Sequence, residues 1–170
     1  MTKVAILLGS DSDLEVMRSA AEILDEFVIG YEINVLSAHR TPDQTVEYLK
    51  AANDKGIKVI IAGAGGAAHL AGVCAAHFPG PVIGVPISSK SLKGLDSLLS
   101  TVQMPPGVPV ATVGIDAAKN AGLLALKVLA ITDTDLSHKL KEYLVKQTQK
   151  VLEKNEKLNE LGYEKYLNEK

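Results

Sequence analysis

The stretch VAILLGSDSDLE, residues 4–15, runs from an apolar segment through a polar turn into a predicted helix start. Residues 4–8 are all apolar, as in a strand that is covered on both faces of its sheet. Ser12 and Glu15 have the spacing of a capping box, which marks the first turn of a helix. A strand that passes directly into a helix begins a βαβ unit, so the stretch predicts an α/β protein with a parallel sheet.

Short apolar runs alternate with amphipathic segments along most of the chain. Further strands are expected at residues 33–36, 59–62, 82–85 and 110–113. Helices are expected at about residues 12–27, 42–55, 67–77, 94–101 and 117–131. Because crossovers between parallel strands are right-handed, helices must cover both faces of the sheet. The sequence predicts a three-layer, doubly wound parallel sheet, flavodoxin-like or Rossmann-like, with ligands at the carboxyl ends of the strands.

Length and composition favour one domain. The 170 residues are 46% hydrophobic, enough to bury one core, and no long linker divides them. We therefore interpret 1–170 as a single catalytic domain, in which residues from about 133 to 170 form a polar C-terminal helical extension. Its apolar stripe consists of Leu136, Leu140, Leu144 and Val151. The stripe can pack on its own domain or on a neighbouring subunit, and both alternatives stay open.

Charge and cysteine content narrow the class of partner. The net charge is -2, which gives no basic field to gather nucleic acid or an anionic membrane. The N-terminal apolar run is too short for a signal peptide or a membrane span. One cysteine, Cys74, excludes an internal disulfide and fits a reducing compartment. We expect a cytoplasmic protein that binds a small molecule or a protein, with no nucleic acid and no membrane.

The turn after the first strand has the groups that bind anions. Gly9, the hydroxyls of Ser10 and Ser12, and the free N–H groups of a helix start suit a phosphate. Asp13 could accept hydrogen bonds from sugar hydroxyls. The alternative is that Ser12 only caps the helix and Ser10 only shapes the turn. This segment alone leaves both interpretations open.

The stretch LSAHRTP, residues 36–42, follows the second strand and contains its own helix start. Thr41 is the expected N-cap, Pro42 the first helical residue and Gln44 the capping-box partner. A helix start does not explain Ser37, His39 or Arg40.

Structural roles exist for this histidine and arginine. His39 could bond a loop carbonyl, and Arg40 could pair with Glu47 or reach solvent. Side by side, however, an imidazole that moves protons and a guanidinium that holds phosphate indicate acid–base chemistry on a phosphorylated substrate.

The third strand runs into AGAGGAAHLAG, residues 62–72, where small side chains let a ligand lie against bare backbone. Gly63, Gly65 and Ala68 satisfy a loose dinucleotide fingerprint. No Asp or Glu occurs between Asp54 and Asp96, so the acidic residue expected to hold the ribose is missing. This argues against a nicotinamide or flavin cofactor.

Other chemistries lack their residue patterns. His69, at the start of the third expected helix, is a candidate site residue. No carboxylate or thiol lies at metal-ligand spacing from His39 and His69, so no metal is expected. Cys74 fits a small core residue. Ser10 and Ser37 lack the G-x-S-x-G elbow of hydrolases. The residues indicate an enzyme acting on a small phosphorylated ligand.

The motifs GSDSD, SAHRTP, AGAGGAAHLAG, GVPISS, LDSLLSTVQMPPGVPVATVGI and NAGLLALKVLA occur in this order over most of the chain, to about residue 150. Together they resemble the aminoimidazole ribonucleotide carboxylase family, and within it the class I, bacterial-type 5-(carboxyamino)imidazole ribonucleotide mutases. The resemblance implies a homo-octameric isomerase of purine biosynthesis that transfers a carboxylate without ATP, metal or cofactor. One departure is Ala71, where the family usually has proline.

The resemblance also implies roles for individual residues. Ser10, Asp13 and Arg40 fall on ribonucleotide-binding positions, with Ser12 and Ser37 nearby. His39 falls on the general acid–base histidine, and Gly65 and His69 lie in the loop that lines the carboxylate pocket. The implied reaction releases CO₂ from the substrate and traps it against Gly63–Gly66, where the ring carbon of aminoimidazole ribonucleotide attacks it. His39 protonates the departing nitrogen and later removes the proton from the carboxylated ring carbon.

Two alternatives remain. The related carboxylases take free CO₂, but they typically have lysine at the position of Arg40 and lack the GAGGAAH loop. A nonenzymatic nucleotide-sensing module would bind the ligand without turnover, although nothing in the sequence favours it.

Overall fold

The structure is a computed structural model that describes residues 2–169. Contacts within the chain divide it into two compact units after Leu129. The first unit holds the sheet and the helices around it, and the second holds the long C-terminal helix.

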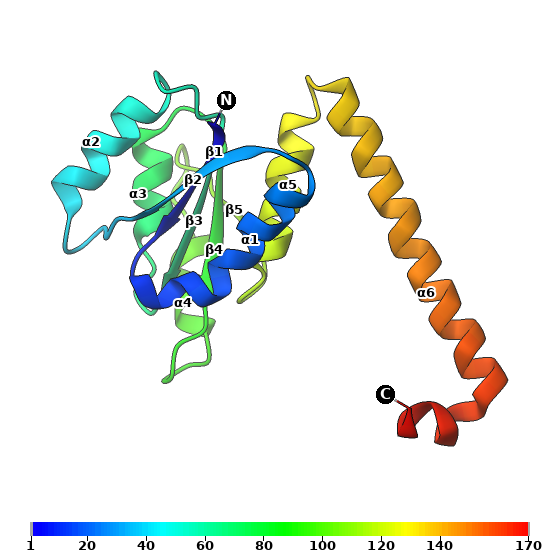
Figure 1. Ribbon diagram of the computed structural model, residues 1–170. Helices are drawn as coiled ribbons and strands as arrows, with labels where there is room; N and C mark the ends of the chain where they lie inside the picture. The colour runs from blue at the N-terminus through cyan, green and yellow to red at the C-terminus, as the bar shows by residue number, and fades with distance from the viewer. Residues whose placement is uncertain (1, 170) are drawn as a thin grey trace. The chain divides into compact units, whose positions relative to one another are not determined.

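The first unit is built on five parallel strands in the order β2-β1-β3-β4-β5 (Figure 1). They are β1 (Thr2–Leu8), β2 (Gly30–Val35), β3 (Val59–Gly65), β4 (Val82–Ile87) and β5 (Ala111–Thr112). This order confirms the flavodoxin-like, doubly wound prediction. The direction of winding reverses between β1 and β3, so a crevice is expected at their carboxyl ends.

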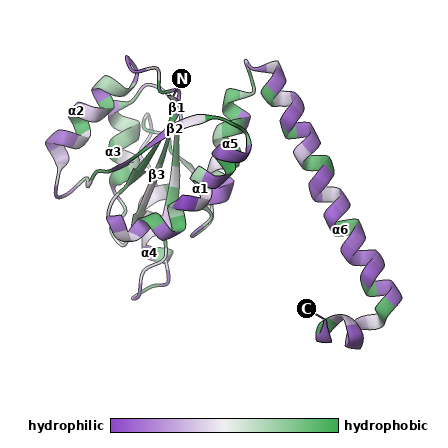
Figure 2. Ribbon diagram, viewed as in Figure 1, coloured by the Kyte–Doolittle hydropathy of each residue, from purple (hydrophilic) through white to green (hydrophobic). Residues whose placement is uncertain are grey.

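Helices cover both faces of this sheet (Figure 1). They are α1 (Leu14–Glu26), α2 (Pro42–Ala52), α3 (Leu70–His77), α4 (Leu95–Val102) and α5 (Ala118–Leu129). Helices α1 and α5 pack on each other and on one face of the sheet, while α2, α3 and α4 cover the other. Strands β1, β3 and β4 are almost wholly buried, which explains their continuous apolar runs. Figure 2 shows the same strands and α3 as mainly hydrophobic.

Two of the predicted helix starts are wrong in detail. A short 3₁₀ turn, η1 (Asp11–Asp13), precedes α1, and the reciprocal bond joins Ser10 and Asp13 rather than Ser12 and Glu15. The Asp13 carboxylate accepts the Ser10 backbone N–H at 3.0 Å, because the tighter turn brings residues three apart into reach. Helix α3 begins at Leu70 rather than at residue 67, since Gly66 has a positive φ of 61° and turns the chain first.

The second unit contains α6 (Thr134–Asn168), which Figure 2 shows as mostly hydrophilic. Its N-cap is Asp133, whose carboxylate accepts the Leu136 N–H at 3.0 Å. The predicted stripe is only partly covered: Leu136 and Leu140 are buried, whereas Leu144 and Val151 are exposed. Gly162, with a φ of 71°, interrupts the helix. Among residues 2–169 no helix is long and apolar enough to cross a membrane.

Close packing of α4 on β4 leaves no room for a side chain at Gly84. A Cβ there would lie 2.3 Å from Thr101 Cγ2 and 2.9 Å from Val110 Cγ1. Thr101 cannot rotate away without breaking its 2.7 Å hydrogen bond to the Ser97 carbonyl. We expect Gly84→Ala to lower the free energy of unfolding by about 1–3 kcal/mol in urea denaturation, the usual cost of overpacking.

Gly114→Ala is the matched control, because a Cβ there makes only an ordinary 3.7 Å contact with Ala117. Equal stability of the two variants would contradict the packing argument.

Candidate active site

The carboxyl ends of β1, β2, β3 and β4 meet around one cavity of about 430 Å³. Every site residue expected from the sequence lines it: Ser10, Ser12, Asp13, Ser37, His39, Arg40, Gly65 and His69. These residues come from the end of β3 and from the segments that follow β1, β2 and β3, and the sheet order brings these segments together. Their placement in one cavity is a structural finding, and their individual roles stay predictions.

The turn after β1 is fixed by its own hydrogen bonds. Asp13 is buried, and burial raises the pKa of its carboxyl, although the Ser10 N–H and the Arg40 charge partly offset this. The Ser12 hydroxyl donates to the Ser10 hydroxyl at 3.0 Å. The Gly9 N–H donates to the Gly63 carbonyl at 2.9 Å and ties the turn to β3. The two serine hydroxyls therefore lie together beside a buried carboxyl at one end of the cavity.

The loop after β2 is organised around Ser37, which is itself buried. Its hydroxyl oxygen accepts the backbone N–H groups of His39 and Arg40, at 3.4 and 3.2 Å. The Thr41 hydroxyl accepts the Ser37 N–H at 2.9 Å and donates to the Ser37 carbonyl at 3.1 Å. Thr41 is the N-cap and Pro42 the first residue of α2, as predicted, but the threonine bonds back to Ser37 and not to a capping box with Gln44. The side chains of His39 and Arg40 thus project from a loop whose backbone is held by hydrogen bonds.

Arg40 connects the loop after β2 to the turn after β1. Its Nη2 donates to the Gly9 carbonyl at 3.0 Å, rather than pairing with Glu47 as the structural alternative supposed. The guanidinium carries five N–H donors, so donors remain to hold an anion in the cavity. This places a permanent positive charge beside the serine hydroxyls.

The last residues of β3 and the start of the loop after it present little more than backbone. Ala64, Gly65 and Gly66 line the cavity, whereas Gly63 does not. A Cβ at Gly63 would lie 2.4 Å from Met17 Sδ, so packing against α1 explains this glycine without a dinucleotide. The expected Gly63–Gly66 pocket is therefore corrected to Ala64–Gly66.

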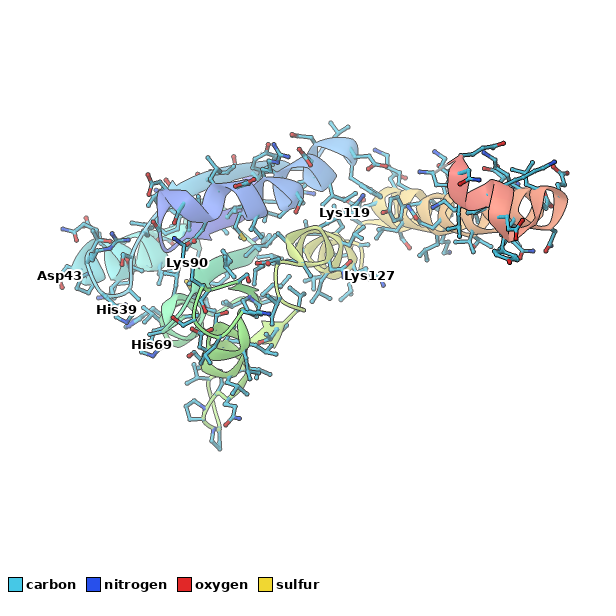
Figure 3. All side chains as sticks on the ribbon, turned by 90° about the horizontal axis from the view of Figure 1, so that it is seen from below. His39, Asp43, His69, Lys90, Lys119 and Lys127 are labelled. Atoms are coloured by element: carbon cyan, nitrogen blue, oxygen red, sulfur yellow. The ribbon has the colours of Figure 1, made fainter. Side chains whose placement is uncertain are left out.

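His39 and His69 meet edge to face across the cavity. His39 Nε2 lies 2.8 Å from His69 Nδ1, and the ring centroids are 4.9 Å apart with an interplanar angle of 78°. Figure 3 shows the two side chains close together. Instead of bonding a loop carbonyl, the His39 imidazole bonds a second imidazole. Both rings are exposed, so a ligand in the cavity can reach them.

Sequence reasoning missed the contribution of β4. Ile87, Ser88 and Ser89 also line the cavity. The Ser88 N–H donates to Asp116 Oδ1 at 2.8 Å, and the Ser89 hydroxyl donates to Asp96 at 2.9 Å. The available signal was position alone, since GVPISS ends a buried strand at the same sheet edge.

Metal ligands and reactive thiols do not gather here. Within residues 2–169, no three His, Cys, Asp or Glu side chains are grouped so that they could hold a metal ion. Cys74 is fully buried in the core, where burial raises the pKa of its thiol to about 12. The chemistry that the cavity offers is anion binding and proton transfer.

Comparison with known proteins agrees with this chemistry. A family model described as AIR carboxylase matches residues 3–150. An N5-carboxyaminoimidazole ribonucleotide mutase from Thermotoga maritima is 58% identical over 170 residues, which covers 100% of this chain and 99% of the relative. A protein of the same name from Pyrococcus abyssi is 62% identical over 167 residues, or 98% and 96% of the two chains.

Solved structures give the same result. A crystal structure of Treponema denticola PurE has a TM-score of 0.85 and 33% sequence identity, and the match covers 93% of this chain and 99% of that one. With a family model that matches most of the chain and relatives that align along its whole length, the chain belongs to the AIR carboxylase family.

Proposed function

We propose that this protein is an isomerase of purine biosynthesis that converts 5-(carboxyamino)imidazole ribonucleotide into 4-carboxy-5-aminoimidazole ribonucleotide. The observation that carries the proposal is the single cavity in which His39, Arg40 and the bare loop at Gly65 lie together. Full-length similarity to two proteins named as mutases supports the same reaction.

Substrate binding follows from the charge distribution in the cavity. The Arg40 guanidinium and the hydroxyls of Ser10 and Ser12 can hold the phosphate of a ribonucleotide. The Asp13 carboxylate uses one oxygen on the Ser10 N–H and keeps acceptor capacity for a sugar hydroxyl. Ser37 contributes by fixing the backbone of His39 and Arg40. We assign the small-molecule partner to this ribonucleotide class.

The reaction needs one proton to move from carbon to nitrogen. The substrate carbamate loses CO₂, which stays against the backbone at Ala64–Gly66, and its nitrogen receives a proton from His39. The adjacent ring carbon of aminoimidazole ribonucleotide then attacks the CO₂. His39 removes the proton from that tetrahedral carbon and restores the aromatic ring. The imidazole is returned to its starting state, so the cycle needs no other reactant. Holding CO₂ beside the carbon is a proximity effect.

Exposed apolar side chains support self-association. Leu95, Leu99 and Val102 of α4 are 44–50% exposed, and Leu144 and Val151 of α6 are more exposed still. Apolar surface of this kind is usually covered by a partner. We infer a homo-oligomer, an octamer as the family resemblance implies, in which the extension from about residue 133 joins subunit packing. The enzyme would act in the cytoplasm, without nucleic acid or membrane.

The reaction is tested by comparing two substrate sets without ATP. We expect 5-(carboxyamino)imidazole ribonucleotide alone to be converted rapidly, measured by the ultraviolet absorbance of the carboxylated product in the cold. Aminoimidazole ribonucleotide with bicarbonate should react much more slowly, since Arg40 and the GAGGAAH loop favour the mutase. Activity with the second set only would make the protein a carboxylase. Ligand binding without turnover of either set would make it a sensing module.

The roles of His39 and Arg40 can be separated by mutation. His39→Asn should lower kcat by about 10²–10⁴-fold, the usual contribution of a general acid–base group, with the Kd for aminoimidazole ribonucleotide little changed. Arg40→Ala should mainly raise that Kd, because it removes charged hydrogen bonds to the phosphate. Calorimetric titration and the absorbance assay measure both effects.

Arg18→Ala is the matched control for Arg40→Ala, since Arg18 is exposed on α1 and its Nε lies 4.0 Å from Glu22 Oε1.

Near-normal turnover in His39→Asn would refute the assignment of His39 as the general acid–base residue.

A further inference from the structure

The contact between His39 and His69 limits which of the two facing ring nitrogens can carry a hydrogen atom. At 2.8 Å between His39 Nε2 and His69 Nδ1, one nitrogen must donate and the other must accept. Two imidazolium rings cannot face each other in this way, because both nitrogens would carry a hydrogen. The pair therefore shares a single hydrogen between its two facing nitrogens.

Both backbones that present these rings are fixed. The N–H groups of His39 and Arg40 bond the hydroxyl of the buried Ser37. His69 immediately precedes α3, its carbonyl accepts the Val73 N–H at 3.0 Å, and the next residue, Leu70, is fully buried. The contact therefore joins two side chains whose backbones are held in place by hydrogen bonds.

The direction of the contact matters for the proposed reaction. His39 Nε2 points at His69 in the loop between β3 and α3, which continues directly from the cavity-lining residues Ala64–Gly66 at the end of β3. A base that takes a proton from the carbon beside trapped CO₂ must have its reacting nitrogen on this side. When His39 Nε2 carries the hydrogen, His69 Nδ1 is the acceptor that holds it there.

We infer that His69 is a positioning residue: its Nδ1 accepts the Nε2–H of His39, which orients the His39 ring toward the β3–α3 loop and holds on Nε2 the hydrogen that a protonated His39 ring gives to the substrate nitrogen. His69 itself transfers no proton to the substrate. This inference rests on the proposed function for its kinetic consequence, while the shared hydrogen is a property of the free protein.

The test compares three substitutions that differ in where they place an acceptor. The Oδ1 of His69→Asn can occupy the place of Nδ1, whereas the polar atoms of His69→Gln lie farther out and His69→Leu has none. We expect His69→Leu and His69→Gln to lower kcat by up to about 100-fold, the effect of a misplaced reacting group, with the Kd for aminoimidazole ribonucleotide within about threefold. His69→Asn should restore most of the rate.

His77→Leu is the matched control, because His77 is an exposed histidine at the other end of α3 and does not line the cavity. Thermal unfolding of each variant checks that it is folded. Equal rates for the Asn and Leu variants would overturn the inference. So would a variant that raises Kd without lowering kcat, since His69 would then be a substrate-binding residue.

A second measurement separates this inference from the proposed function. In protein labelled with ¹⁵N at histidine, NMR should show one hydrogen coupled to nitrogens of two different rings, and the signal should vanish in His39→Asn and His69→Leu. Its presence without turnover of the carbamate would refute the reaction and keep the pair. Its absence in an active wild-type protein would refute the pair and keep the reaction.

Discussion

Gly9 links the three strand ends on which the cavity depends. Its N–H donates to the Gly63 carbonyl of β3, and its carbonyl accepts from the guanidinium of Arg40 in the loop after β2. A Cβ at Gly9 would lie 3.3 Å from Ala64 Cβ, so a side chain would press on the loop that lines the cavity. Backbone groups of one residue thus hold the anion-binding turn, the arginine and the bare loop at a common edge.

The same arrangement places the buried carboxyl of Asp13 near groups that stabilise its charge. Asp13 is buried close to Arg40, and the cost of burying its carboxyl is reduced by the Ser10 N–H and by the arginine charge. Arg40 is otherwise exposed, so its remaining N–H groups can donate hydrogen bonds to solvent or to a ligand. The site therefore combines a fixed cation, hydroxyl donors and an imidazole pair without grouping metal ligands in the described part of the chain.

Much of this could be predicted from residues that act locally. Continuous apolar runs such as Val59–Ile61 predicted strands covered on both faces, and the polar loops after β1, β2 and β3 predicted where a site would form. The capping box at Ser12 was wrong, because a 3₁₀ turn was inserted ahead of α1. The contact between His39 and His69 could not be predicted, since it joins residues 30 positions apart through the conformation of two loops. Ser88 was missed because its only signal was its position after a buried strand, with no adjacent His–Arg pair or predicted capping motif to mark it.

The most direct test of carboxylate transfer within the cavity follows the carboxylate carbon itself. The substrate is prepared with ¹³C in its carbamate and is converted in excess unlabelled bicarbonate, with carbonic anhydrase present to equilibrate any free CO₂. If CO₂ is held in the cavity between release and attack, the product formed at early times keeps the ¹³C label in its carboxylate. Loss of the label to the solution pool at the same stage of the reaction would contradict transfer within a single cavity.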